Sequence, residues 1–343
     1  MAAVGNTVPT LVDVAKGLDP NGAPARVAEI LNQRNEIFDS LHMLQGNLPT
    51  GHRLTMRTGL PTAAWRLLNN GVTPGKSSKA QVDEACGMMQ AFSEVDKKLA
   101  ELSGDIASFR LSEATAFIEA MGQEAVGTLF YGNSGLAPEE FTGLGVRYSS
   151  TSAANGQNVL SAGGLGSDNT SIWLTVSGPE TFGLLYPKSS QAGLRHKDMG
   201  EQVVQTGTGI GTGRMIALLD SFEWDLGMYL KDWRYVVRIP NIDVSDLVAQ
   251  STTQASSAAT AIIKLMSRAM HRIPSFSMGR AAWHMNRTVL SMLDVAGLDK
   301  SASAITVQPA LDQFGNPTRG NYMFRGVPIK VNDQLLNTES VVS

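Results

Sequence analysis

The chain has 343 residues, of which 17% are charged and 43% hydrophobic, and its formal net charge is −3. This length accommodates two or three domains, and the charged fraction lies below the ~25% of an average soluble protein. The single cysteine, Cys86, excludes an intrachain disulfide and a cysteine-based zinc cluster. The slightly acidic balance argues against a dedicated nucleic-acid-binding protein. We expect neither a signal peptide nor a membrane span, because the chain starts without a basic region and no apolar run approaches ~18 residues.

The first part of the chain predicts a helix, a pair of strands and a second helix. An apolar stripe predicts an amphipathic helix over residues 24–41. Apolar and polar residues alternate in "RLTMRT", which predicts a strand over 53–58. The apolar residues of 82–92 lie mostly at every second position, which predicts its partner strand. Residues 111–130 carry apolar side chains at helical spacing. Between the two strands lies a long excursion, 59–81, and loops of this length inside compact domains are usually functional.

The stretch "NNGVTPGKSSKAQV" in this excursion is similar to a phosphate-binding P-loop. Lys76 follows a glycine as that motif requires, but the first glycine is Gly71, where the spacing requires a glycine at Asn70. A P-loop also needs a buried strand before it and a helix after it, whereas the following "SSKAQVDEACGMM" is more typical of a strand. We therefore interpret the stretch as an exposed turn, and a nucleotide-binding enzyme using residues 71–77 stays as the alternative.

The second part of the chain predicts a separate mixed domain. A Ser-, Ala-, Gly- and Asn-rich segment, 149–170, predicts the boundary. Strands are expected at 171–176 and 233–239, and a final strand at 327–331. Because strands and helices do not alternate regularly, the fold class is α+β rather than a doubly wound sheet.

Two further helices are expected in this domain. Apolar stripes predict helices over 256–273 and 281–296, the first ended by Pro274 and the second capped by Gly297. The second helix would include the pair Trp283-His284, for which packing is the favoured role.

We find no catalytic, cofactor-binding or metal-binding constellation, and we expect no enzyme activity. "GTGIGTG" at 207–213 does not have the third glycine of a dinucleotide fingerprint, and its flanks predict a hairpin tip. The chain has no G-x-S-x-G elbow, and none of its five histidines forms an i, i+4 pair. We therefore predict no catalytic residues, no metal site and no cofactor.

The order of several stretches along the chain resembles a known family. These stretches include "TLVDVAKGLDPNG", "GNLPTGHRLTMRTGLPTAAWRLLNNGV", "RLSEATAFIEAMGQE", "SDNTSIWLTVSGP", "DWRYVVRIPNID" and "FRGVPIKVNDQLLNTE". Together they resemble the major capsid proteins of tailed bacteriophages, which have the Hong Kong 97-type fold. The resemblance is strongest to short-tailed phages related to the Bordetella podovirus.

The resemblance implies a structural virion protein that self-assembles into an icosahedral capsid around double-stranded DNA, which is present only as enclosed cargo. Implied partners are further copies in hexamers and pentamers, a scaffolding protein, a portal and a decoration protein, with no membrane. Assembly would take place in the bacterial host cytoplasm. The implied parts are an N-terminal arm (1–50), an extended loop (51–93), the spine helix and peripheral domain (94–150), an axial domain (151–318) and a C-terminal return to the peripheral domain (319–343).

Charge provides an observation that is independent of the resemblance. Residues 51–82 contain five cations and no acid, whereas 83–124 contain nine acids and three cations. Opposite charge on adjacent segments suits a loop that leaves its own subunit and lies on a neighbour. Folding back within one subunit and phosphate binding by a DNA-packaging protein are the alternatives. The candidate contact residues are Arg53, Arg57, Arg66, Lys76, Lys79, Glu113, Glu119 and Glu124.

Overall fold

The computed structural model divides into two compact units. The helix–hairpin unit comprises Met1–Gln33, Met88–Val126 and Gly193–Asp225, and the core unit comprises Arg34–Gly87, Gly127–Ala192 and Leu226–Ser343. Among the residues that the structure describes, no helix has both the length and the apolar character that a membrane crossing requires. The structure describes residues 9 and 33 and residues 35–343, apart from 103, 189, 206–212, 249–251, 299–309, 312–316 and 319–321.

The core unit is built around strand β4 (Asn169–Ser177). All nine residues of β4 are buried, so both faces of the strand are covered. β4 pairs antiparallel with β8 (Val236–Asp243) on one side and with β9 (Arg280–Met285) on the other. β9 in turn pairs parallel with β13 (Val327–Val331). The strands expected at 171–176 and 327–331 are therefore confirmed.

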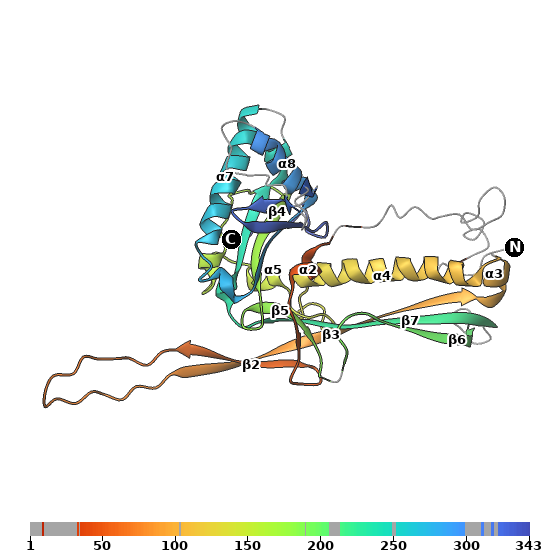
Figure 1. Ribbon diagram of the computed structural model, residues 1–343, viewed down its shortest axis with the longest axis horizontal. Helices are drawn as coiled ribbons and strands as arrows, with labels where there is room; N and C mark the ends of the chain where they lie inside the picture. Colours follow the sequence, from red (N-terminus) through yellow and green to blue (C-terminus); the bar gives the residue numbers. More distant parts are fainter. Residues whose placement is uncertain are drawn as a thin grey trace. The chain divides into compact units, whose positions relative to one another are not determined.

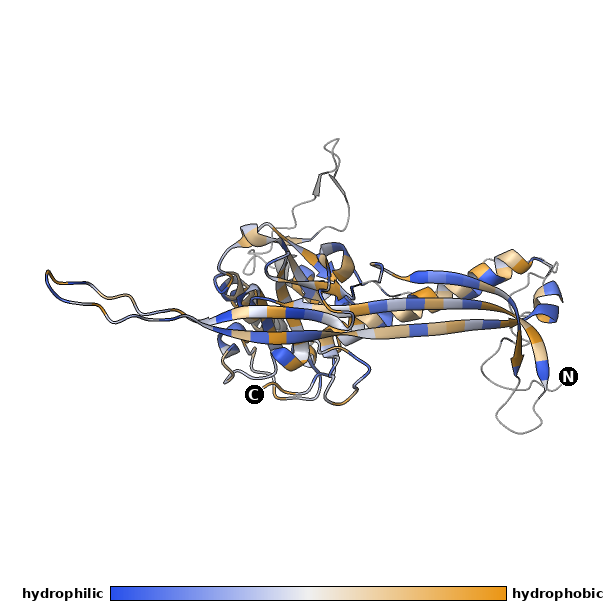
Figure 2. Cartoon of the chain, turned by 90° about the horizontal axis from the view of Figure 1, so that it is seen from below, coloured by the Kyte–Doolittle hydropathy of each residue, from blue (hydrophilic) through white to orange (hydrophobic). Residues whose placement is uncertain are grey.

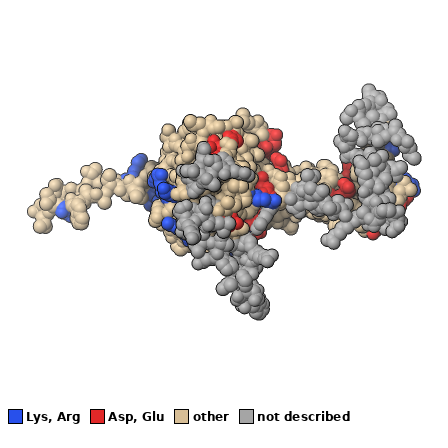
Figure 3. Space-filling model, turned by 90° about the horizontal axis from the view of Figure 1, so that it is seen from above, with Lys and Arg blue, Asp and Glu red and all other residues tan. Residues whose placement is uncertain are grey.

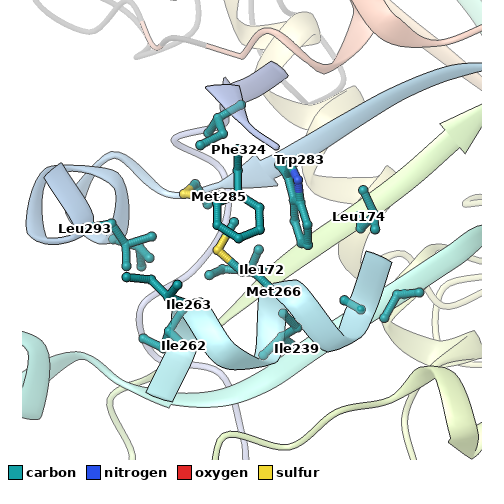
Figure 4. Close-up of a cluster of buried hydrophobic side chains, with 14 of the residues drawn as sticks. Ile172, Leu174, Ile239, Ile262, Ile263, Met266, Trp283, Met285, Leu293 and Phe324 are labelled. Atoms are coloured by element: carbon teal, nitrogen blue, oxygen red, sulfur yellow. The ribbon is translucent and has the colours of Figure 1, made fainter. Parts of the chain in front are cut away.

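Helices cover one face of this sheet. Ile172 and Leu174 of β4 belong to an apolar cluster with Met266 of α7 (Thr252–Met270) and Leu293 of α8 (Arg287–Leu298). Figure 4 shows these side chains converging between the strands and the helices. Because the chain buries its apolar stripes here, this cluster is the main core of the unit.

The opposite face of β4 is covered by aromatic residues from the segments before it. The ring of Trp173 lies 6.0 Å from the rings of both Phe130 and Tyr148, and the guanidinium of Arg238 lies 5.0 Å from the Trp173 ring. The alternation of Ile172, Trp173 and Leu174 thus serves two different packing layers. The face that carries Trp173 also carries Ser171 and Thr175, and these polar side chains are buried with it.

The helix–hairpin unit combines the first part of helix α4 with three strands. In this unit α4 (Ile106–Tyr131) lies along β3 (Ser78–Asp96) and β7 (Arg214–Leu230), as Figure 1 shows. Phe117 of α4 stacks on Phe222 of β7 with ring centroids 5.7 Å apart. The helix expected at 111–130 and the strand expected at 82–92 are confirmed, and both are longer than expected.

The strand β6 (Arg195–Gln205) pairs antiparallel with β7 and completes the hairpin of this unit. This confirms the hairpin predicted around "GTGIGTG", although residues 207–212 themselves lie outside the described residues. The remaining elements are short: α2 (Ile37–Ser40), β1 (Met43–Gln45), α3 (Lys97–Leu102), α5 (Leu144–Arg147), η1 (Gly156–Asn158), β5 (Phe182–Tyr186), η2 (Trp233–Tyr235), α6 (Val244–Val248), η3 (Phe276–Met278), β10 (Ala310–Leu311), β11 (Pro317–Thr318) and β12 (Met323–Phe324).

The helix expected over 281–296 is wrong in its first half. Residues Arg280–Met285 form β9, and α8 begins only at Arg287. Asn286 sets this start, because its Oδ1 accepts a hydrogen bond of 2.9 Å from the Thr288 N–H. The last four residues of β9 are all buried, so both faces are covered there, and the sequence has no clean period that separates this strand from a helix. The helix also runs through Gly297 to Leu298, so Gly297 is not the cap.

Two further expectations need correction at their boundaries. The strand expected at 233–239 begins at Val236, because Asp232 accepts a 3.0 Å hydrogen bond from the Arg234 N–H and starts the 3₁₀ turn η2. In the segment 24–41, residues 24–32 lie outside the described residues, and the described helix is only Ile37–Ser40. The Glu36 N–H instead bonds to the Val331 carbonyl at 3.0 Å, which draws this segment to β13.

Candidate inter-subunit surface

The extended loop starts as an antiparallel pair, β2 (Gly51–Gly59) with β3. Arg53 lies opposite Asp83, and its Nε donates a 2.6 Å hydrogen bond to Asp83 Oδ1. This hydrogen bond lowers the pKa of Asp83 and raises that of Arg53. Further along the pair, Arg57 lies opposite Lys79. Of the five predicted loop cations, Arg53 thus has a partner in its own chain, whereas Arg57 and Lys79 form a like-charged cross-strand pair.

Polar contacts fix the base of the loop within the core unit. The amide of Asn47 pairs with the backbone of Arg53, accepting from its N–H at 2.7 Å and donating to its carbonyl at 3.0 Å. The Arg147 guanidinium donates two hydrogen bonds, of 2.8 and 2.5 Å, to the Glu84 carboxylate, which is 6% exposed. This bidentate pair joins α5 (Leu144–Arg147) to β3, and removing either partner would leave the other charge uncompensated.

The outer part of the loop, residues 60–77, exposes large apolar side chains; we call it the tip. Trp65 is fully exposed at 104%, Leu68 is 96% exposed, Leu60 79% and Leu67 74%. Figure 2 marks hydrophobic residues within this segment. On the face of the segment that Figure 3 shows, no Asp or Glu atoms are visible. Exposed apolar groups gathered in one segment indicate an interaction site. From the sequence we expected only the cations of this segment to make contacts, although the apolar residues of "AAWRLL" also indicate an interaction site.

The tip does not have the context of a nucleotide site. Residues 61–77 contain no strand or helix, and Ser78 begins strand β3 rather than a helix. A turn closes the tip instead: the Asn70 N–H donates to the Leu67 carbonyl at 3.2 Å, and Asn69 has a φ of +65°. The side chain of Arg66 adds a 2.7 Å hydrogen bond from its Nε to the Asn70 carbonyl. Lys76 is exposed in this irregular segment, as expected of an exposed turn.

The predicted acidic residues Glu113, Glu119 and Glu124 all lie on α4 in the helix–hairpin unit. Glu119 Oε1 accepts hydrogen bonds from the Gln33 N–H at 3.0 Å and from the Gln123 amide at 2.9 Å. On the same helix, Arg110 bonds to Asp198 at 2.7 Å and to Asp220 at 2.8 Å, and these bonds raise its pKa.

A buried polar network, which we did not expect from the sequence, ties the C-terminal segment to the rest of the core unit. Glu339 accepts a 2.8 Å hydrogen bond from the Arg238 guanidinium, a 2.6 Å bond from the Tyr131 hydroxyl, and a further bond from Ser171. Arg238 and Glu339 are each 5% exposed. Burial, with the Glu339 charge beside it, raises the pKa of Tyr131. The network explains how the chain end packs on β4.

Among the described residues, His284 is a completely buried histidine, with 0% of its surface exposed. Asn332 Oδ1 accepts from the Ile37 N–H, which turns its Nδ2 toward His284 Nδ1 at 3.1 Å. Nδ1 is therefore the acceptor, and the Nε2–H faces Thr175 Oγ1 at 3.0 Å. Burial, followed by the charge of Lys330, lowers the pKa of His284 to about 3. The imidazole is thus a neutral structural group.

Elsewhere on the part of the chain that the structure describes, two features bear on chemistry, a groove and the grouping of metal-ligating side chains. A groove beside β2 is lined by groups of both signs, including Arg57, Glu180 and Arg234. In the part of the chain that the structure describes, no three His, Cys, Asp or Glu side chains are grouped to hold a metal ion. The surface that distinguishes this protein is therefore the extended loop with its apolar tip.

Comparisons with known proteins agree on one class. The family model for major capsid protein GP7 matches residues 19–343. No curated protein sequence matches the chain. A solved chain of bacteriophage Epsilon15 is 29% identical, with a TM-score of 0.75, over 100% of this chain and 99% of that one.

Two further solved structures cover less of this chain and superpose on it less closely. The capsid of bacteriophage JBD30 is 10% identical, with a TM-score of 0.47, over 90% of this chain and 95% of that one. The capsid of a native GTA particle is 8% identical, with a TM-score of 0.44, over 65% and 95%. This mixed α+β chain belongs to the GP7 family of major capsid proteins, has the Hong Kong 97-type fold and is a capsid protein of a tailed-phage virion.

Proposed function

We propose that copies of this protein assemble into an icosahedral head around double-stranded phage DNA, and that the extended loop of one copy docks on residues 83–124 of another. The observation that carries the docking is the tip, where Trp65 and Leu68 are almost completely exposed. Trp is among the residues that most often dominate the energy of protein interfaces. Burying such side chains contributes about 25 cal/mol for each Å² of apolar surface removed from water.

Charge sets the orientation of this contact. Arg57 and Lys79 repel each other across the strand pair, and like charges directly opposite destabilise a sheet. An acid from another copy placed between them would relieve the repulsion. Glu113, Glu119 and Glu124 are the proposed source, with Arg66 and Lys76 of the tip as further cations. Arg53 contributes less, because Asp83 already accepts from it.

The same proposal assigns the parts of the chain and its partners. Residues 1–50 would form the N-terminal arm, 51–93 the extended loop, 94–150 the spine helix and peripheral domain, 151–318 the axial domain and 319–343 the return. A separate scaffolding protein, a portal and a decoration protein would join the shell. The JBD30 capsid is decorated with minor capsid protein trimers. Assembly would occur in the host cytoplasm, in a short-tailed phage related to the Bordetella podovirus, and the role is structural rather than enzymatic.

Electron microscopy of two matched double variants tests the docking. Trp65→Ser with Leu68→Ser removes the apolar tip, and we expect subunits or capsomer rings in place of closed shells. Leu136→Ser with Leu165→Ser is the control, because each of these leucines is 84% exposed and lies in the core unit outside the tip. Normal shells from the tip variant, or equal loss of shells from both variants, would contradict a special role of the tip.

A further inference from the structure

The tip carries an Asn-Gly sequence, Asn70-Gly71, in an arrangement that favours a covalent change. In such a pair the backbone nitrogen of the glycine can attack the carbonyl carbon of the asparagine side chain. The reaction needs an accessible glycine nitrogen and a backbone free to close a five-membered ring. Glycine suits it because it has no Cβ to hinder the approach. Both residues are exposed, and a Cβ placed on Gly71 would meet no atom within 4 Å.

The two reacting groups are already neighbours. The Gly71 nitrogen lies 3.0 Å from Asn70 Oδ1, the oxygen bonded to the carbon that it must attack. The attacking species is the deprotonated amide nitrogen. Arg66 Nε donates a 2.7 Å hydrogen bond to the carbonyl oxygen of the same peptide group. A charged donor at this oxygen stabilises the negative charge that deprotonation places on the peptide group.

A second Asn-Gly pair, Asn155-Gly156, has the opposite geometry. The Gly156 N–H donates to the Ala153 carbonyl at 2.8 Å, and the Asn155 Nδ2 donates to the Arg147 carbonyl at 2.8 Å. Gly156 is buried in the 3₁₀ turn η1. The nucleophile is engaged and the side chain is held away from it, so this pair serves as an internal control. The third pair, at residues 21–22, lies outside the described residues.

We propose that Asn70 is a site of spontaneous deamidation, with Arg66 as the residue that promotes it. The Gly71 nitrogen loses its proton and forms a bond to Asn70 Cγ, and the bond from Cγ to the side-chain nitrogen breaks, releasing ammonia that carries the proton. Water then opens the resulting succinimide at one of its two carbonyls and leaves aspartate or isoaspartate. No oxidant or reductant takes part.

The product changes the charge of the extended loop. Residues 51–82 contain five cations and no acid, and deamidation introduces the first carboxylate, close to Arg66. The modified loop is less complementary to an acidic surface. If the loop docks as proposed above, docking also fixes the backbone at the tip and slows ring closure. The change would then mark subunits that stay unassembled.

Peptide mapping by mass spectrometry of the full-length, unassembled protein tests the site. After incubation at mildly alkaline pH, we expect the Asn70 peptide to gain the mass of an amide-to-acid change, with isoaspartate as one product, while the Asn155 peptide stays unchanged. Gly71→Ala and Arg66→Gln should each slow the change several-fold, and Arg66→Lys should restore part of the rate. No conversion at Asn70, or equal conversion at Asn155, would overturn the proposal.

The same measurement on assembled shells separates this inference from the docking proposal. Conversion at Asn70 in free subunits establishes the site whatever the shells show. A slower rate in shells than in free subunits supports a docked tip. An equal rate in both would overturn the docked tip and its protective effect, while the site itself would stand.

Discussion

The tip and strand β4 both carry a tryptophan among aliphatic residues, yet the chain treats them in opposite ways. Trp173 of β4 is 0% exposed, between two aromatic rings and a guanidinium, whereas Trp65 of the tip is 104% exposed. The apolar surface of β4 is used to fold the subunit. The apolar surface of the tip is left unused by its own chain in the described residues, which is the pattern expected of a surface that another molecule covers.

Replacing Trp173 should give the largest effect on folding. Trp173→Ala removes a completely buried ring that packs on Phe130 and Tyr148, so we expect the free energy of unfolding to fall by about 3–5 kcal/mol. Denaturant unfolding of the unassembled subunit measures it. A loss below about 1 kcal/mol would mean that this layer repacks, and the contrast with the tip would weaken.

Breaking the buried ion pair should have an effect of similar or slightly smaller size. Glu339→Ala leaves the Arg238 guanidinium buried without its carboxylate, which costs about 3–5 kcal/mol for pairs of this kind. The matched control is Glu180→Ala, because the Glu180–Lys231 pair is at the surface, with the Glu180 side chain 68% exposed. We expect the control to change stability by about 0–1 kcal/mol. Equal losses from the two variants would show that burial of the pair is unimportant.

Acid should weaken the core through His284. In the unfolded chain this imidazole takes up a proton near pH 6.5, whereas in the folded protein its pKa is about 3. The unfolded state therefore binds more protons between these values, so the free energy of unfolding decreases as the pH falls from 6.5 towards 3, by about 1.4 kcal/mol per pH unit.

A comparison with His284→Gln isolates this contribution. The variant lacks the titrating group, so its stability should decrease less steeply with acid than that of the wild type, in denaturant unfolding at several pH values. Parallel curves for the two proteins would contradict the buried neutral histidine.

Reversing charge on the loop should affect assembly rather than folding. Arg57→Glu with Arg66→Glu places acids where the proposal needs cations, and each exposed contact is worth about 0–1 kcal/mol, repeated over every copy in a shell. We expect sedimentation to show fewer shells and more free capsomers. Glu119→Arg with Glu124→Arg in the same chain should partly restore the shells. Normal shell yield from the first variant would contradict the proposed charge contact.

The smallest effect on the subunit itself is expected at Trp65. Trp65→Ala removes a side chain that is fully exposed, so the free energy of unfolding of the unassembled protein should change by no more than about 0.5 kcal/mol. Its melting curve should overlay that of the wild type, in contrast to Trp173→Ala. A clear drop in the melting midpoint would place the ring against its own chain and remove the basis of the comparison.

The sequence by itself determined the elements whose pattern is local. Alternation predicted β2 and β13, helical spacing predicted α4 and α7, and the order of quoted stretches indicated the capsid family. The tertiary structure alone decided three other points: that Arg280–Met285 is a strand, that Arg53 has a partner in Asp83, and that Glu339 closes a buried network. The physical reason is that a strand buried on both faces has no polar period, and that polar partners distant in the chain meet only after folding. Trp65 and Trp173 are the same type of residue in similar apolar stretches of sequence. Only packing distinguishes the tryptophan that stabilises the subunit from the tryptophan left to bind a partner.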